Sequence, residues 1–457
     1  MLRVAVIGSG PSGVYTAQSL IEQQAVPDIE VYVLDRLPCP YGLVRYGVAP
    51  DHEKIKSLQN NLRMVLEHPR VHFLGNVEAG APGLGVEELR EIFDAVVFCV
   101  GAATDRHLGI PGEELPGSHP ATEFVAWYSA HPDAAAVRFT LAARSAVVIG
   151  VGNVAVDVVR MLSRGAAELA ATDMPQGPLG ALADSRVEDV WMVGRRGPSQ
   201  AKFTTKELRE LGSLPDTEVC VRPEELALDP AYRDPGELPA VARRNVAVLR
   251  GWAEQTATGP ADGGPAVRAR RRIHLRFFLR PAEVLGDASG VRAVRFERTA
   301  PDGRGGVTGT GEFEDIQGQL VLRSVGYRGT PQPGLPFDEA TGTVPHLAGR
   351  VLRDRAPLPG VYVAGWIKRG PTGVIGTNRP CAKETASSLL ADAPMLAERH
   401  TADDPVAALA RAGQRPVPWP GWLAIEAAEA AWGHGLGRGT VKLPDWAGLL
   451  AAAQANG

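Results

Sequence analysis

The feature that most constrains this chain is a glycine-rich turn directly after its first apolar run. Residues 2–7 are rich in β-branched side chains, and Gly8-Ser9-Gly10-Pro11-Ser12-Gly13 follows them, ahead of a helix-compatible stretch at 14–21. A strand, a G-x-G-x-x-G turn and a helix in this order form the fingerprint of a dinucleotide-binding unit. Its glycines allow a tight turn, approach of a pyrophosphate and close helix packing, while the helix start offers N–H groups to the phosphates. The turn therefore predicts a bound adenine dinucleotide.

Two further strands extend this first unit. Residues 29–34 end at Asp35, 27 residues after Gly8. The fingerprint places an acid on a ribose hydroxyl at an offset of roughly 20 residues. Residues 71–77 predict the next strand, with Val77 toward the adenine side of the ligand. The intervening residues 36–52 are rich in Pro and Gly and predict a loop at the carboxyl end of a strand, where ligands bind in open α/β sheets.

A second fingerprint begins near residue 146. The strand-like residues 146–149 lead into Gly150-Val151-Gly152-Asn153-Val154-Ala155, which has alanine at the close-packing position. The next strand, 190–193, ends in Gly194-Arg195-Arg196-Gly197, where the first unit has an acid. Guanidinium groups pair with a 2′-phosphate that a carboxylate would repel. A solvated basic turn is the alternative, but the position after a second fingerprint favours NADP(H) here and FAD in the first unit.

The order of these motifs predicts an α/β fold with two Rossmann-like dinucleotide-binding domains. The length of 457 residues is sufficient for two or more domains. We expect an NADP-binding domain at 104–325, inserted into an FAD-binding domain built from 1–103 and 326–457, whose last part contains C-terminal helices. A glycine-rich stretch at 368–378 leads into a helix expected at 382–390, and it would suit the flavin ring and ribityl chain.

Composition excludes several classes of protein. A net charge of −4 gives no global argument for binding nucleic acid or a membrane surface. No apolar run approaches the roughly 18 residues of a membrane span. The cysteines, Cys39, Cys99, Cys220 and Cys381, form no C-x-x-C pair, which argues against a disulfide framework, a zinc site or a redox-active dithiol. Because the chain opens on a strand, we expect no signal peptide and a cytoplasmic protein.

Two charged segments follow the second fingerprint. Thr204 or Thr205 can cap a helix with Glu207 and Glu210 on one face, which are either surface acids or site residues. The stretch from Arg243 to Arg280 is strongly basic, and residues 270–279 alternate like a strand with arginines on one face. This basic stretch is either a solvated face or a landing patch for an acidic protein partner.

Together the motifs resemble the adrenodoxin-reductase-like ferredoxin–NADP reductases, including their actinobacterial members, over nearly the whole chain. The resemblance rests on Gly42-Leu43-Val44-Arg45, residues 47–52, 152–155 and 194–198, and Gly365-Trp366 with the stretch to Asn378. It implies FAD on Gly8, Gly10, Ser12, Gly13, Asp35, Leu43, Val77, Trp366, Gly373, Val374 and Ile375. It implies NADP on Gly152, Asn153, Val154, Arg195, Arg196 and Glu207, with Gly373 near the nicotinamide. His52 and Glu210 match the catalytic polar pair. Asp35 departs from the Glu common in relatives.

The resemblance implies an oxidoreductase that passes electrons from NADPH through FAD to a ferredoxin-type iron–sulfur protein. We expect a monomer that requires no bound metal. A disulfide reductase would need paired cysteines, which the sequence lacks. A flavin monooxygenase and a redox-sensing protein that binds both nucleotides without turnover remain the alternatives.

Overall fold

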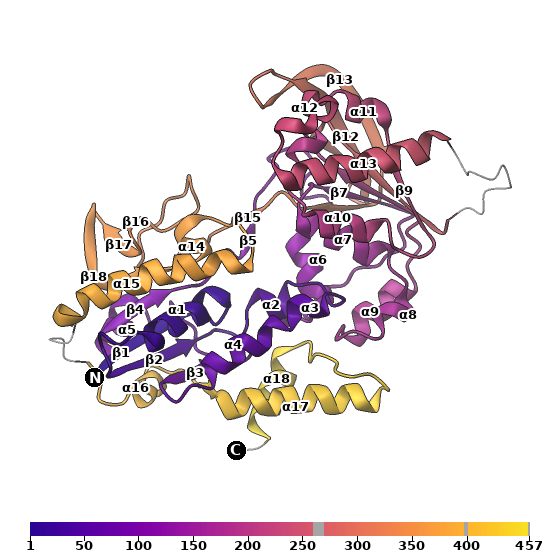
Figure 1. Cartoon of the computed structure of the whole chain (residues 1–457). Helices are drawn as coiled ribbons and strands as arrows, with labels where there is room; N and C mark the ends of the chain where they lie inside the picture. Colours follow the sequence, from indigo (N-terminus) through magenta and orange to yellow (C-terminus); the bar gives the residue numbers. More distant parts are fainter. Residues whose placement is uncertain (259–268, 397–400, 456–457) are drawn as a thin grey trace. The chain divides into compact units, whose positions relative to one another are not determined.

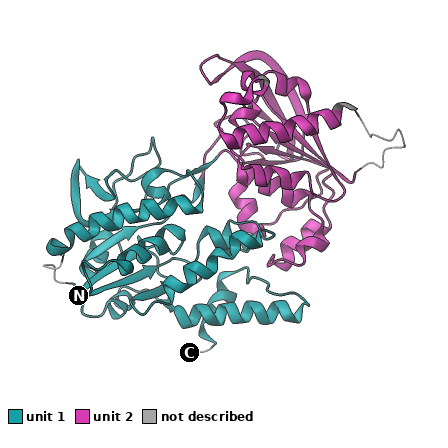
Figure 2. Cartoon of the chain, viewed as in Figure 1, with its two compact units in different colours: residues 1–104, 129–135, 326–457 teal, residues 105–128, 136–325 magenta. Residues whose placement is uncertain are grey.

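The chain divides into two compact units. The computed structural model describes residues 1–258, 269–396 and 401–455. Unit 1 contains residues 1–104, 129–135 and 326–457, and unit 2 contains residues 105–128 and 136–325 (Figure 2). Unit 2 is therefore inserted in the chain of unit 1, except that the short segment 129–135 returns to unit 1.

Unit 1 is built on an eight-stranded sheet with the order β16-β17-β18-β4-β1-β2-β3-β19 (Figure 1). Its strands are β1 (Leu2–Ile7), β2 (Ile29–Leu34), β3 (Val71–Gly75), β4 (Ala95–Phe98), β16 (His346–Leu347), β17 (Arg350–Arg353), β18 (Ala356–Val363) and β19 (Val417–Pro418). Strands β18, β4, β1, β2 and β3 are parallel, and the antiparallel strands lie at the edges. The predicted strands thus pair in one parallel sheet, with the turn after β1 at its centre.

Both faces of this sheet are buried. Val4 and Val6 pack in one apolar cluster with side chains of α1, α4, α15 and α17, whereas Ala5 and Ile7 pack in another with side chains of α5 and α16. Strand side chains alternate between faces, so an uninterrupted apolar strand requires helices on both sides. The helices are α1 (Pro11–Glu22), α2 (Leu43–Tyr46), α3 (Glu53–Lys56), α4 (Leu58–Leu66), α5 (Val86–Ile92), α14 (Trp366–Arg369), α15 (Asn378–Leu396), α16 (Pro405–Arg411), α17 (Trp419–Gly435) and α18 (Trp446–Gln454).

Unit 2 combines a six-stranded parallel sheet, with the order β6-β14-β7-β8-β10-β9, and a three-stranded antiparallel sheet, β11-β12-β13. The parallel strands are β6 (Ser118–Pro120), β7 (Ser145–Ile149), β8 (Asp189–Val193), β9 (Thr217–Val221), β10 (Arg271–Arg276) and β14 (Leu320–Arg323). The antiparallel strands are β11 (Leu279–Asp287), β12 (Gly290–Pro301) and β13 (Val307–Gln317). Val147 and Ile149 of β7 share an apolar cluster with Val294 and Phe296 of β12, so the two sheets pack together.

The helices of unit 2 are α6 (Ala121–Tyr128), α7 (Asn153–Ser163), α8 (Ala166–Leu169), α9 (Gln176–Ala183), α10 (Thr205–Leu211), α11 (Pro223–Ala227), α12 (Pro230–Arg233) and α13 (Ala240–Thr258). In both units a strand, a glycine turn and a helix occur in succession, which confirms the predicted α/β fold of two Rossmann-like units.

In the described part of the chain, no helix has the length and apolarity needed to cross a bilayer.

Candidate functional site

The first glycine turn brings β1 and α1 into backbone contact. Gly10 precedes α1, Pro11 occupies its first turn, and Ser12 and Gly13 are buried. A Cβ built on Gly13 would lie 1.8 Å from the carbonyl oxygen of Gly8, so only glycine lets the helix come this close to the turn. The first N–H groups of a helix lack partners within it and are available to an anion. The turn therefore has the backbone geometry of a phosphate cradle.

Asp35 ties this turn to the end of β2. Its Oδ2 accepts hydrogen bonds from the N–H and the hydroxyl of Ser9, at 2.7 and 2.5 Å, and its Oδ1 accepts one from the N–H of Leu37 at 2.9 Å. Burial raises the pKa of Asp35, although these hydrogen bonds act in the opposite direction. The side chain thus supports the glycine turn, while its Oδ1, which accepts one hydrogen bond, keeps capacity to accept another.

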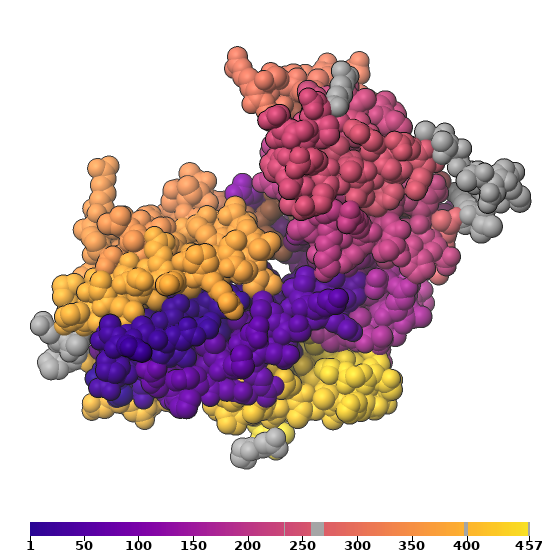
Figure 3. Space-filling view, viewed as in Figure 1, coloured from indigo at the N-terminus to yellow at the C-terminus, as the bar shows by residue number. Residues whose placement is uncertain are grey.

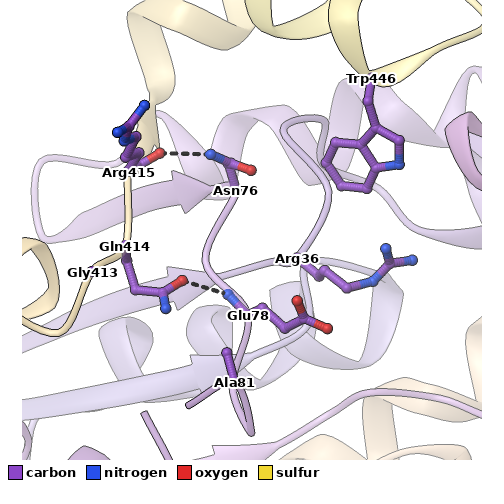
Figure 4. A pocket seen from close by; sticks show the side chains of 8 residues that line it. All are labelled: Arg36, Asn76, Glu78, Ala81, Gly413, Gln414, Arg415 and Trp446. Atoms are coloured by element: carbon purple, nitrogen blue, oxygen red, sulfur yellow. Dashed lines mark hydrogen bonds between the residues drawn. The ribbon is translucent and has the colours of Figure 1, made fainter. Parts of the chain in front are cut away.

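A pocket of about 370 Å³ lies at the carboxyl ends of β2 and β3 (Figure 4). Val77, which is buried, follows β3 and stands between two residues that line the pocket, Asn76 and Glu78. On the opposite wall, the carbonyl of Arg415 accepts a hydrogen bond from the Asn76 amide at 2.8 Å. The residues that line the pocket are Arg36, Asn76, Glu78, Ala81, Gly413, Gln414, Arg415 and Trp446. A ligand on the glycine turn can therefore extend past Asp35 into a polar pocket.

The other residues predicted to contact FAD differ in exposure. Leu43 opens α2 and is 42% exposed, Trp366 opens α14 and is half-buried, and Gly373 and Val374 are exposed, with Ile375 half-buried beside them. The buried hydroxyl of Ser12 has no nitrogen or oxygen hydrogen-bond partner within the described residues, and its polar neighbour there is the Cys99 thiol. A buried polar group without a partner is costly unless a ligand or water satisfies it. The cradle, the pocket and this hydroxyl fit a dinucleotide such as FAD.

The second glycine turn leads into α7 and is open at its centre. No atom lies within 4 Å of a Cβ built on Gly152, whereas Ala155 is fully buried against the sheet. Asn153 opens α7, and its Oδ1 accepts a hydrogen bond from the N–H of Thr204 at 2.8 Å. Because Thr204 caps α10, this bond fixes the start of α10 beside the glycine turn. Val154 follows in the first turn of α7 and is half-buried.

Arg195 and Arg196 follow β8 with their side chains unpaired. Arg195 is exposed and Arg196 half-buried, and neither forms an ion pair with a described residue. Their backbone carbonyls are fixed, because Thr299 donates its hydroxyl hydrogen to Arg195 and Phe278 donates its N–H to Arg196. A rigid backbone with two free guanidinium groups is well suited to bind a phosphate bidentately.

The polar residues expected at the reacting centre come from both units. His52 belongs to unit 1, is buried, and immediately precedes α3. Glu207 and Glu210 belong to α10 of unit 2, where Glu207 is buried and Glu210 half-buried. The burial of Glu207 excludes the alternative that both are surface acids.

Sequence reasoning missed Arg160 of α7, which is buried and donates hydrogen bonds to Asp157 at 2.6 Å and to Glu210 at 3.2 Å. The available signal was a single arginine in a mostly apolar helix, three residues after an aspartate.

The basic stretch from Arg243 to Arg280 is not one exposed face. The strand at 270–279 is β10, which lies between β8 and β9 in the parallel sheet. The expectation that it shows its arginines to solvent is wrong for Arg271 and Arg276, which are buried, whereas Arg272 is 31% exposed and pairs with Asp189. Arg271 is buried and donates to the carbonyls of Val187, Ser163 and Arg164, and Arg276 is buried between Glu225 and Glu314. The exposed arginines of the stretch are Arg243, Arg244, Arg250, Arg270 and Arg280; Arg268 lies outside the described residues.

Comparison with known proteins agrees with this geometry. Residues 2–192 match the pyridine nucleotide-disulphide oxidoreductase family. The structure of Mycobacterium tuberculosis FprA in complex with NADPH superimposes with a TM-score of 0.91, at 42% sequence identity over 99% of both chains. The fold and the paired fingerprints thus define a two-dinucleotide oxidoreductase.

Three relatives that match nearly the whole chain are reductases of ferredoxin or adrenodoxin. NADPH-ferredoxin reductase FprA of M. tuberculosis is 44% identical over 98% of each chain. The mitochondrial NADPH:adrenodoxin oxidoreductase of Homo sapiens is 40% identical over 97% of this chain and 90% of its own. The corresponding Arabidopsis thaliana protein is 38% identical over 99% and 95%. This chain belongs to the adrenodoxin-reductase-like NADPH–ferredoxin reductase family.

Proposed function

We propose that this chain is an FAD-dependent NADPH–ferredoxin reductase. The observation that carries the proposal is the difference between its two glycine turns. The first is followed by a strand that ends in a half-buried acid, and the second by a strand that ends in two arginines without an ion-pair partner among the described residues. The first arrangement suits a ribose without a 2′-phosphate and the second suits one that carries it. The relatives named above, reductases of ferredoxin and adrenodoxin, support this function.

FAD binds unit 1 in this proposal. Gly8, Gly10, Ser12 and Gly13 bind the pyrophosphate, Asp35 the ribose, and Val77 with the adjoining pocket the adenine. Leu43, Trp366 and the segment Gly373–Ile375 bind the flavin end. This assigns the predicted FAD domain, residues 1–103 and 326–457, to unit 1.

NADP(H) binds unit 2, which contains most of the predicted domain 104–325. Gly152, Asn153 and Val154 bind its pyrophosphate, and Arg195 and Arg196 bind its 2′-phosphate. Glu207 accepts hydrogen bonds from the nicotinamide carboxamide. Gly373 of unit 1 completes the binding of the nicotinamide.

The residues of this chain act by binding and orienting, since the bound flavin supplies the redox chemistry by exchanging two electrons with NADPH and single electrons with an iron–sulfur protein. His52 and Glu210 are the proposed catalytic residues. His52 donates or holds a proton on the flavin side, and Glu210 is oriented by the Arg160 guanidinium, which is bonded to it at 3.2 Å. Holding reactants in the attack geometry removes an entropic cost that the free reactants would bear.

The electron acceptor is a ferredoxin-type iron–sulfur protein, which docks on the exposed arginines of the basic stretch. Arg243, Arg244 and Arg250 all lie on α13 and are exposed, so they can attract an acidic partner. We propose that the enzyme acts in this complex as a cytoplasmic monomer.

The test begins with the purified full-length protein. We expect a yellow protein whose visible absorbance bleaches when NADPH is added without air and returns when a ferredoxin is added. A protein that stays colourless after reconstitution with FAD refutes the proposal. Oxygen consumption coupled to hydroxylation of a small molecule would instead identify a flavin monooxygenase, and absence of ferricyanide reduction would identify a sensor.

The arginines are tested separately. Arg195→Ala and Arg196→Ala should each raise the KM for NADPH at least tenfold and leave that for NADH unchanged, because a hydrogen bond to a charged group contributes about 1.5–3 kcal/mol. Arg292→Ala removes an arginine that is 66% exposed and pairs with Asp287, and it serves as the matched control. An unchanged ratio of NADPH to NADH turnover would refute the 2′-phosphate assignment.

A further inference from the structure

A buried ion pair joins α2 to α17 within unit 1. Arg45 of α2 donates from Nη2 to Oε1 of Glu429 at 2.6 Å, across 384 residues of sequence. The two side chains are only 6% and 2% exposed. The pair therefore connects α2, which follows β2 in the chain, to residues 419–454, which we call the C-terminal segment.

The C-terminal segment contacts both ends of Arg45. Glu429 Oε1 also accepts the N–H of Leu443 at 2.8 Å, while Lys442 Nζ donates to the carbonyl of Arg45 at 2.7 Å. The Arg45 guanidinium lies over the ring of Trp422, 5.0 Å from its centroid. The backbone and the side chain of Arg45 are thus both fixed by the C-terminal segment.

The start of α2 forms part of the glycine cradle. The N–H of Tyr41 donates to the carbonyl of Ser9 at 3.1 Å. Gly42 has a φ of +50°, and a Cβ built on it would lie 2.9 Å from Cα of Gly10. Because α2 and the glycine turn touch through their backbones, a displacement of Arg45 would change the width of the cradle.

An exposed ion pair on the same helix provides a comparison. Arg63 of α4 and Glu426 of α17 lie 2.9 Å apart but are 34% and 44% exposed. Figure 3 shows the yellow C-terminal residues on the surface of unit 1 beside the purple residues of the first half of the chain. Exposed pairs contribute little, whereas removing one partner of a buried pair leaves a costly unpaired charge. A buried arginine bonded to both an acid and an aromatic face also specifies one geometry rather than several.

We propose that Glu429 is a positioning residue, which acts through Arg45 to keep α2 against the first glycine turn, so that the C-terminal segment controls how firmly FAD is retained. This inference rests on the proposed binding of FAD to unit 1. Lys442 assists by fixing the carbonyl of Arg45 in the same place.

The experiment uses full-length holoenzyme and the release of FAD, followed as a rise in flavin fluorescence after dilution. Glu429→Gln, which leaves the Arg45 charge unbalanced, should accelerate release at least tenfold. Glu426→Gln, one turn away on the same helix, should stay within about twofold of the parent. Binding of 2′,5′-ADP to unit 2 is measured in parallel and should be the same in all of these proteins.

The two binding measurements distinguish a positioning role at the FAD cradle from a general loss of stability. Release within twofold of the parent for Glu429→Gln, or equal weakening of FAD and 2′,5′-ADP binding, would overturn the inference. If Glu429→Gln does not fold, the double variant Arg45→Met/Glu429→Met replaces it, since it buries no unpaired charge. Faster release from the double variant supports positioning, and unchanged release overturns it. A parent protein without FAD would refute the proposed function instead.

Discussion

Gly13 offers a sharp test of how the first glycine turn binds its ligand. In the variant Gly13→Ala, the new methyl would start 1.8 Å from the carbonyl oxygen of Gly8, and it must move by about 1.6 Å to reach an ordinary 3.4 Å contact. The contact is with backbone, so no side-chain rotation can relieve it. Helix α1 has to shift away from the turn, together with the N–H groups at its start.

The size of the effect follows from that shift. Overpacking of this kind costs about 1–3 kcal/mol in the free energy of unfolding. An N–H···O bond of about 2.9 Å does not survive a displacement of this size, and each bond to a charged group is worth about 1.5–3 kcal/mol. We therefore expect Gly13→Ala to release FAD at least tenfold faster than the parent. The assay is flavin fluorescence after dilution, combined with urea unfolding.

A matched substitution separates the clash from the residue change. Gly180 lies in α9, with no atom within 4 Å of a built Cβ. Gly180→Ala should leave FAD release unchanged and stabilise the protein slightly, since alanine favours a helix over glycine by up to about 1 kcal/mol. Normal FAD retention by Gly13→Ala would refute the close-packing argument for the first turn.

Three further predictions concern charge and burial. The double variant Arg243→Ala/Arg244→Ala should raise the KM for ferredoxin several-fold at low ionic strength and less at high salt, while ferricyanide reduction stays unchanged. An effect on this KM that does not depend on salt would contradict docking of ferredoxin on α13. Burial raises the pKa of Cys39 to about 11 and that of Cys99 to about 12, so mass spectrometry should find both unlabelled by a thiol reagent at pH 8 and labelled in urea. Rapid labelling of the native protein would contradict their burial. Burial opposes the ionisation of Glu314, but the hydrogen bonds that it accepts from Arg276 lower its pKa in the folded protein. The stability that this pair provides is therefore fully present above the unfolded pKa of about 4.3, and it is lost as the pH falls through the folded pKa. Glu314→Gln should lower the free energy of unfolding, measured with urea, by about 1–3 kcal/mol at pH 7 and by less at pH 4. Glu283→Gln, at an exposed pair with Arg295, should lower it by under about 0.5 kcal/mol. An equal effect of Glu314→Gln at both pH values would contradict the ion-pair explanation.

Local motifs could be predicted from the sequence because their physics is local. The strand, glycine turn and helix at residues 2–22 depend on neighbouring residues, and the structure has the same order. The capping of α10 by Thr204 is also local, since an N-cap hydroxyl accepts the N–H three residues ahead, here that of Glu207.

Long-range pairings could not be predicted in this way. The alternation in residues 270–279 indicates a strand, but it does not tell which strands lie beside it, and β10 turned out to be internal. An arginine in an internal strand is compatible with burial only where acids or carbonyls meet it, as Glu225 and Glu314 meet Arg276. The return of residues 129–135 to unit 1 has the same origin, because Asp133 pairs with Arg36 across 97 residues of sequence.

The difference between the two glycine turns is itself informative. The first turn ends in Gly13, where a methyl would collide with the Gly8 carbonyl, and the second ends in Ala155, whose methyl is fully buried without such a collision. The second turn therefore leaves room for a methyl at the position where the first turn does not. The alanine thus fits the same motif and is not evidence of a weaker one. Accordingly, Ala155→Gly should leave NADPH binding nearly intact, whereas the reverse change at Gly13 should weaken the retention of FAD.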